Sequence, residues 1–193
     1  MNKISKLFAL LAFLLSVHVL ESSEITTLYQ LSEILPFVEK DTLVLFDIDD
    51  VIVAPHASWI WEESFLKHKM SSNQLQEMRF PMKYQLVDPS IEELFSSIRK
   101  KGGLIAAATA RPCIDDKLAI FLMRKRLEFD HPFCGNTGLL ACSTKPKGIS
   151  LFDALLNHPK AILFIDDKKE NCESVLESSR VHNVPCQTFF APV

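Results

Sequence analysis

The stretch TLVLFDIDD, residues 42–50, joins an apolar run to three carboxylates. The run TLVLF is short and has charged residues on both sides. Such runs are typical of strands that are buried on both faces of a parallel sheet. Asp47 and Asp49 lie two apart directly after this strand and are expected to project to the same side of the chain. One carboxylate can then attack while the other handles a proton.

Two further apolar runs end in polar side chains of the same kind. Residues 104–108 (LIAAA) run into Thr109, and residues 161–165 (AILFI) run into Asp166 and Asp167. A last strand is expected at residues 186–190. Helical patterns fill the intervals between these strands, at residues 26–39, 58–80, 89–101, 114–127, 148–156 and 167–179.

The helix before the second strand has the sharpest end signals. Asp88 is a natural N-cap, Pro89 suits the first helical position, and Gly102–Gly103 suits the end. One apolar face is predicted along this helix, formed by Ile91, Leu94, Phe95 and Ile98.

Alternating helices and buried strands predict an α/β fold, a three-layer α/β/α sandwich with a mainly parallel, Rossmann-like sheet. Right-handed crossovers place the carboxyl ends of such strands at one edge, where ligands bind. Asp47, Asp49, Asp166 and Asp167 would therefore crowd one crevice. Like charges this close need a cation, and Mg²⁺ is the hard, oxygen-preferring ion that suits phosphate chemistry.

Four segments, in order, resemble the motifs of the haloacid dehalogenase superfamily. They are FDIDDVIV (46–53), ATAR (108–111), KPKG (145–148) and FIDDKKEN (164–171). A leader followed by FDIDD is also similar to the secreted acid phosphatases of that superfamily, and residues 84–102 are similar to an exported bacterial branch. The resemblance spans most of the chain after the leader.

The resemblance implies a Mg²⁺-dependent phosphatase that acts through an aspartyl-phosphate. Asp47 would be the nucleophile, Asp49 the general acid and base, and Thr109 and Lys147 would complete the catalytic set. The first and the fourth motif would supply the ligands of the metal ion, namely Asp47, Asp49, Asp166 and Asp167. The phosphoryl group would be held by Thr109, Ala110, Arg111 and Lys147.

Several assignments stay open at this stage. Lys145 lies two residues before Lys147 and could take the same role. Asp166 could instead be the N-cap of the next helix, a role compatible with metal binding. Asn171 either hydrogen-bonds back to the acidic loop or is an exposed helical residue.

The segment between the first two motifs, residues 51–86, is short. In the superfamily this insert forms a cap, so the resemblance implies a small helical cap or none, and an open crevice. A small-molecule phosphomonoester is the expected substrate. The alternatives are a phosphotransferase of the same superfamily, or a catalytically silent secreted protein that kept the fold and binds a partner.

The N-terminus reads as a secretory signal. Lys3 and Lys6 precede the apolar residues 7–20 (LFALLAFLLSVHVL), and small residues follow. We expect residues 1–23 to be a leader of an exported, periplasmic or secreted protein, with residues 24–193 as a single domain. The cleavage site is poorly defined, so an uncleaved leader acting as an anchor stays open.

Charge and cysteine content exclude other classes. The 193-residue chain has a formal net charge of −3 and no basic patch, which argues against a nucleic-acid partner. Its five cysteines show no zinc-type spacing, and whether any pair forms a disulfide is not readable.

Overall fold

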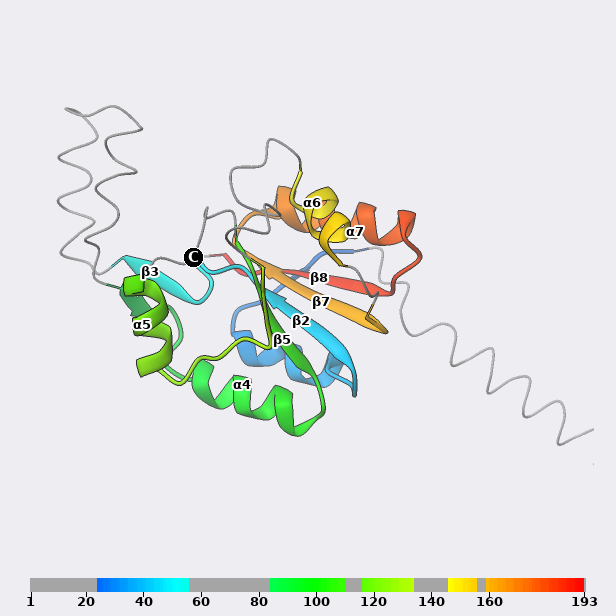
Figure 1. Ribbon diagram of the computed structural model, residues 1–193. Helices are drawn as coiled ribbons and strands as arrows, with labels where there is room; N and C mark the ends of the chain where they lie inside the picture. The colour runs from blue at the N-terminus through cyan, green and yellow to red at the C-terminus, as the bar shows by residue number, and fades with distance from the viewer. Residues whose placement is uncertain (1–23, 56–83, 110–115, 134–145, 156–158, 193) are drawn as a thin grey trace, which may run out of the picture.

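Six parallel strands form the central sheet of the computed structural model (Figure 1). The structure describes residues 24–55, 84–109, 116–133, 146–155 and 159–192. In spatial order the strands are β1 (Thr26–Thr27), β8 (Cys186–Phe190), β7 (Ala161–Asp166), β2 (Thr42–Phe46), β5 (Leu104–Ala108) and β6 (His131–Phe133). The predicted α/β architecture is confirmed, and β2 lies between β7 and β5 at the centre of the sheet.

Helices cover both faces of this sheet. On one side lie the 3₁₀ helix η1 (Leu31–Phe37) and the helices α4 (Ile91–Lys100) and α5 (Asp116–Arg124). On the other side lie α6 (Lys147–Ala154) and α7 (Lys169–Val181). The three-layer arrangement follows because a sheet that is apolar on both faces must be covered twice.

Strand alternation divides the core into two clusters. Val44 and Phe46 of β2 pack toward α4, whereas Leu43 and Leu45 pack toward α6 and α7. All five residues of β2 are buried, as the apolar run predicted. The ring of Phe46 lies 5.3 Å from that of Phe95 on α4, which joins this helix to the central strand.

The predicted helix at residues 26–39 is wrong. Thr26 and Thr27 instead form β1, which pairs with the end of β8, and the helical part shrinks to η1. Pro36 lies inside η1 and has no N–H to donate, so a regular α-helix is disfavoured there. The apolar spacing was real, since Leu31 and Ile34 are buried.

Helix α4 begins two residues later than predicted. Its N-cap is Ser90, and Asp88 instead accepts hydrogen bonds at Oδ1 from the backbone N–H and the hydroxyl of Ser90, at 2.8 and 2.7 Å. Asp88 thus closes a turn before the helix. The predicted apolar face and the end at Gly102, with φ +83°, are confirmed.

A short antiparallel hairpin brackets the insert between the first two motifs. Strand β3 (Val53–Pro55) pairs with β4 (Tyr84–Leu86), and neither strand was predicted. The helix expected at residues 58–80, and with it most of the proposed cap, lies outside the described residues. Within the described ranges no helix has the length and apolarity needed to cross a membrane.

Candidate active site

The register between β2 and β7 brings Asp47 and Asp166 together. Phe46 is paired with Ile165, and the N–H of Asp47 donates to the carbonyl of Ile165 at 2.9 Å. Because side chains alternate along a strand, both aspartates fall on the face that α6 and α7 cover. Asp166 has no exposed surface and Asp47 is nearly as buried.

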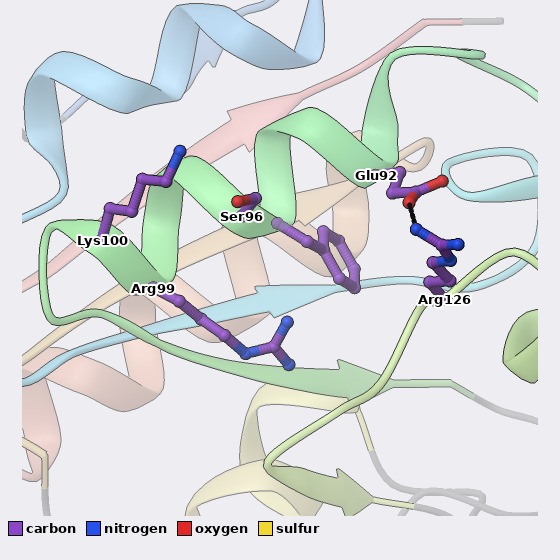
Figure 2. Close-up of a pocket in the computed structure, with 6 residues that line it drawn as sticks. Glu92, Ser96, Arg99, Lys100 and Arg126 are labelled. Carbon is purple, nitrogen blue, oxygen red and sulfur yellow. Dashed lines mark ion pairs between the residues drawn. The ribbon is translucent and has the colours of Figure 1, made fainter.

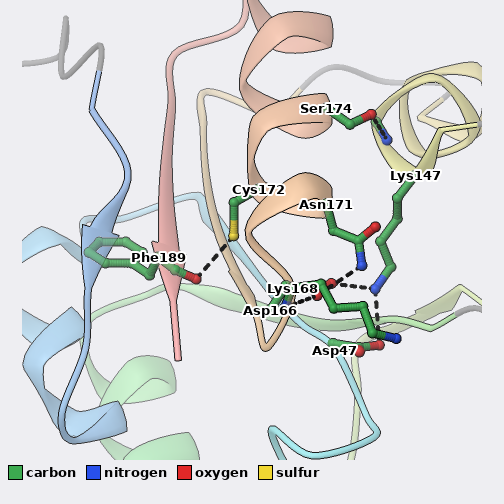
Figure 3. Close-up of polar contacts among 9 residues, drawn as sticks. Asp47, Lys147, Asp166, Lys168, Asn171, Cys172, Ser174 and Phe189 are labelled. Carbon is green, nitrogen blue, oxygen red and sulfur yellow. Dashed lines mark hydrogen bonds and ion pairs between the residues drawn. The ribbon is translucent and has the colours of Figure 1, made fainter. Parts of the chain in front are cut away.

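Lys147 joins these two carboxylates (Figure 3). Its Nζ lies 3.0 Å from Asp47 Oδ1 and 2.5 Å from Asp166 Oδ2. The lysine is the first residue of α6, is itself buried, and has its Nζ 5.6 Å above the centre of the Phe164 ring. Burying an ammonium group between two aspartates is costly, and buried charged groups of this kind cluster at functional sites.

Three donors hold Asp166. Its Oδ2 accepts from Lys147, and its Oδ1 accepts from the backbone N–H of Lys168 and from Nδ2 of Asn171, both at 2.9 Å. Of the two alternatives left open for Asn171, the structure has the hydrogen bond to the acidic loop. The N-cap interpretation of Asp166 is wrong, because this residue ends β7 and α7 begins only at Lys169.

Burial dominates the electrostatics of Asp47. It raises the pKa of this carboxyl from about 3.8 to about 7, although Lys147 opposes the rise and the nearby Asp166 adds to it. For Lys147 burial acts to lower the pKa, but the two carboxylates outweigh it and hold the pKa above the ordinary value. The lysine therefore stays charged, and Asp47 keeps its proton to a higher pH than an ordinary carboxyl does.

Asp167 completes a cluster that suits a divalent cation. One oxygen each from Asp47, Asp166 and Asp167 lies within 4.8 Å of the others. Oδ1 of Asp167 is buried and has no hydrogen-bond partner, and burial together with Asp166 raises the pKa of this carboxyl. An orphaned carboxylate oxygen beside two others is the donor set that Mg²⁺ takes. The residues thus fit the predicted ion.

The chain turns sharply after Asp47. Asp50 has φ 62°, and its N–H donates to the carbonyl of Val53 at 2.8 Å. The N–H of Val53 donates to the carbonyl of Ile48 at 2.9 Å. Ile48 is fully buried and anchors the loop. Asp49 is half-buried on this loop and is not one of the three clustered carboxylates, so its predicted metal ligation would rest on its backbone carbonyl.

The remaining predicted site residues divide into described and undescribed ones. Thr109 directly follows β5, the neighbour of β2, and is fully buried at the same edge of the sheet. The other phosphate-binding candidates, Ala110 and Arg111, lie outside the described residues, and so does Lys145.

Ser174, which no sequence motif singled out, supports the site through Gly148. The hydroxyl of Ser174 on α7 accepts a hydrogen bond from the N–H of Gly148 on α6 at 2.9 Å. A Cβ on Gly148 would lie 2.0 Å from the carbonyl oxygen of Ser174. Gly148 can be seen in the sequence directly after Lys147, but no sequence pattern indicates that it packs against Ser174.

The buried cysteines are not part of this chemistry. Cys172 on α7 and Cys186 on β8 are free, buried thiols, and burial raises the pKa of each to about 12. Thiols that resist ionisation are poor nucleophiles and poor metal ligands. The other three cysteines lie outside the described residues.

A separate hollow of about 460 Å³ lies on α4, across the sheet from Lys147 (Figure 2). It is lined by Glu92, Phe95, Ser96, Arg99, Lys100 and Arg126. Two of its cations already have partners: Arg126 pairs with Glu92 at 3.6 Å, and Arg99 contacts the carbonyl of Glu128 and lies 3.7 Å from Asp130. Its charges are thus largely compensated, unlike those of the aspartate cluster.

Several solved structures are similar to this chain. A haloacid dehalogenase superfamily hydrolase from Ehrlichia chaffeensis matches with a TM-score of 0.51 and 13% identity, over 79% of this chain and 91% of that one. A haloacid dehalogenase-like hydrolase from Streptococcus pneumoniae matches at 0.49 and 18%, over 78% and 93%. A putative phosphatase from Clostridium difficile matches at 0.48 and 12%, over 77% and 84%.

Sequence comparisons add nothing to this likeness, since no family model and no curated protein matches the chain. The match to the Ehrlichia structure shows that the fold is haloacid dehalogenase-like, and at 13% identity it shows the fold alone. Function has to be argued from the site.

Proposed function

We propose that this protein is a Mg²⁺-dependent phosphohydrolase that cleaves small-molecule phosphomonoesters through an aspartyl-phosphate on Asp47. One observation carries the proposal: the buried Lys147 contacts both Asp47 and Asp166, and one carboxylate oxygen of Asp167 lies within 4.8 Å of an oxygen of each of these aspartates. Phosphoryl transfer depends chiefly on positioning and charge neutralisation, and this cluster offers both.

In the first step an oxygen of Asp47 forms a bond to phosphorus while the bond from phosphorus to the ester oxygen breaks. Asp49 gives its proton to the departing alkoxide, which leaves as an alcohol. Lys147 contacts Asp47 at 3.0 Å and so lies beside the nucleophile. The ammonium then offsets charge that builds on the transferred group.

In the second step the carboxylate of Asp49 takes a proton from water, whose oxygen attacks phosphorus. The bond between phosphorus and Asp47 breaks, inorganic phosphate leaves, and the free carboxylate of Asp47 returns. Thr109, Ala110 and Arg111 would hold the oxygens of the phosphoryl group through both steps. Asp49 serves both steps because it is acid in one and base in the other.

Asp47, Asp166 and Asp167 would hold Mg²⁺, with the backbone carbonyl of Asp49 as a further ligand. The bound ion would neutralise the repulsion between the carboxylate nucleophile and an anionic substrate. Among the described residues the cluster has one buried lysine, Lys147, against three aspartates; burial first, and then the charge of Asp166, raises the pKa of Asp47.

The test is Mg²⁺-dependent release of p-nitrophenol from its phosphate, followed by a panel of phosphomonoesters. We expect turnover by the wild type and its loss in Asp47→Asn. Asp41→Asn is the matched control, because Asp41 lies at the surface, before β2, and pairs with the exposed Lys160 at 2.7 Å. Wild-type turnover by Asp47→Asn would refute the nucleophile, and an inactive wild type across the panel would favour the silent binding protein.

We also propose that residues 1–23 are an export signal and that the protein acts outside the cytoplasm, free of nucleic acid. The apolar run of residues 7–20 after two lysines supports this proposal. N-terminal sequencing of the native protein tests it. A start at Met1 in a soluble cytosolic fraction would end the proposal, and a start at Met1 in the membrane fraction would indicate the uncleaved anchor.

A further inference from the structure

One face of α7 contacts Asp166 and the residue that follows Lys147. Asn171 and Ser174 lie three residues apart on this helix and therefore share a face. Asn171 contacts Asp166, and Ser174 contacts the residue that follows Lys147 (Figure 3). The lysine and the aspartate come from different elements, α6 and β7, so their 2.5 Å contact depends on how α7 holds each of them.

Asn171 determines which way Asp166 faces. Its Nδ2 and the N–H of Lys168 both donate to Oδ1, so that oxygen is saturated. Oδ2 accepts from Lys147, so within the described part of the chain the two oxygens of Asp166 have different donors. Loss of the Asn171 amide would let the carboxylate rotate, and the oxygen offered to Lys147 and to a cation would no longer be defined.

Ser174 caps α6 from outside the helix. The N-cap residue of α6 is Pro146, whose side chain has no acceptor and makes no capping hydrogen bond. The hydroxyl of Ser174 supplies that acceptor to the N–H of Gly148. The two helices meet so closely here that a Cβ on Gly148 would clash with the backbone of Ser174. The start of α6, and Lys147 with it, is therefore fixed against α7.

We propose that Asn171 and Ser174 are positioning residues: Asn171 orients Asp166, and Ser174 fixes Lys147 through the first turn of α6. The inference rests on the proposed function, since it assigns these residues to a cation and phosphate site. It goes further in making α7 the element that aligns the two charged groups. Neither residue needs to touch the substrate to act.

The experiment compares Asn171→Ala, Ser174→Ala and Ser174→Thr with the wild type. Glu173→Ala is the matched control, because Glu173 is exposed on the same helix between the two positions. Calorimetry measures the Kd for Mg²⁺ alone and the Kd for inorganic phosphate at saturating Mg²⁺. Turnover of p-nitrophenyl phosphate gives kcat and KM separately, and circular dichroism checks folding.

We expect Asn171→Ala to weaken Mg²⁺ binding by about 10–100-fold, as loss of a partner that orients a metal ligand does. Ser174→Ala should leave the Kd for Mg²⁺ within about 3-fold, weaken phosphate binding and lower kcat by about 10–100-fold, since misplacement of a reacting group costs rate. Ser174→Thr keeps the hydroxyl and should restore kcat. Glu173→Ala should match the wild type throughout.

Wild-type Mg²⁺ and phosphate binding in both alanine variants would overturn the inference, and so would a wild type that binds no Mg²⁺. A wild type that binds Mg²⁺ but hydrolyses no phosphomonoester would refute the proposed function instead. The inference would then still be decided by comparing the Kd for Mg²⁺ of Asn171→Ala with that of the wild type. Should Ser174→Ala fail to fold, a normal kcat in Ser174→Thr supports the role of the hydroxyl and a kcat as low as that of Asn171→Ala overturns it.

Discussion

Replacing Asp47 by asparagine should stabilise the metal-free protein above neutral pH. Burial raises the pKa of this carboxyl from about 3.8 to about 7, so between these values the folded state holds a proton that the unfolded state has lost. The folded state binds more protons there, and stability therefore falls as pH rises through this window and levels off above it. The asparagine side chain has the shape of the carboxyl without this cost.

The size of the effect follows from the same pKa values. A difference of about three in pKa corresponds to about 4 kcal/mol of lost stability. Relaxation around a buried pair reduces such figures, so we expect Asp47→Asn to exceed the wild type by about 2 kcal/mol at pH 8.5. At pH 4.5 most of the wild-type carboxyl is already protonated in the folded state, and the two proteins should differ by less than about 1 kcal/mol.

The assay is guanidinium chloride unfolding with a chelator present, at pH 4.5, 7 and 8.5. Asp166→Asn is the matched comparison, because Asp166 touches the same lysine but is held by three donors. Its loss should destabilise the fold by about 3–5 kcal/mol, as breaking a buried, fully bonded charge does. A pH-independent difference between Asp47→Asn and the wild type, or a less stable Asp47→Asn at pH 8.5, would refute the reasoning.

Four further outcomes are expected. Lys147→Met should destabilise the fold by about 3–5 kcal/mol, by denaturant unfolding, and abolish turnover, whereas Lys145→Met should keep turnover. Thr109→Val keeps the shape but loses the hydroxyl, and kcat should fall by about 10–100-fold in a steady-state assay. Mg²⁺ binding at pH 7 should release about half a proton from Asp47, whose pKa is about 7, and calorimetry in buffers of different ionisation enthalpy measures it. Gly148→Ala should destabilise the protein by about 1–3 kcal/mol in thermal unfolding, because its Cβ would lie 2.0 Å from a backbone oxygen.

The main strands were predictable because each is a continuous apolar run. Residues 42–46, 104–108 and 186–190 have the predicted bounds, and β7 is one residue longer because Asp166 itself pairs in the sheet. The missed strands β1, β3, β4 and β6 have two or three residues each, too few for any period to show. Helix α4 starts later than predicted because Asp88 hydrogen-bonds Ser90 in a turn, so that Ser90 and not Asp88 is the N-cap.

The site was predictable in its carboxylates and less so in its lysine. Strand ends alone placed Asp47 and Asp166 at one edge, and the register of β2 on β7 brings them together. Lys147 was favoured over Lys145 because Gly148 and a helix follow it, and in the structure Lys147 contacts both Asp47 and Asp166 at the start of α6. The roles of Asn171 and Ser174 depend on tertiary packing.

The layered α/β fold and the sheet edge at which the acidic residues gather could be predicted from the chain alone, because apolar runs and strand alternation are local properties. The contacts of Lys147 with Asp47 and Asp166, and of α7 with the start of α6, could be seen only in the folded protein. Those contacts depend on the register between strands and on the close approach of α6 to α7 at Gly148. The strand register and the approach of α6 to α7 each bring together residues that are far apart in the chain, and no local sequence pattern specifies such a contact.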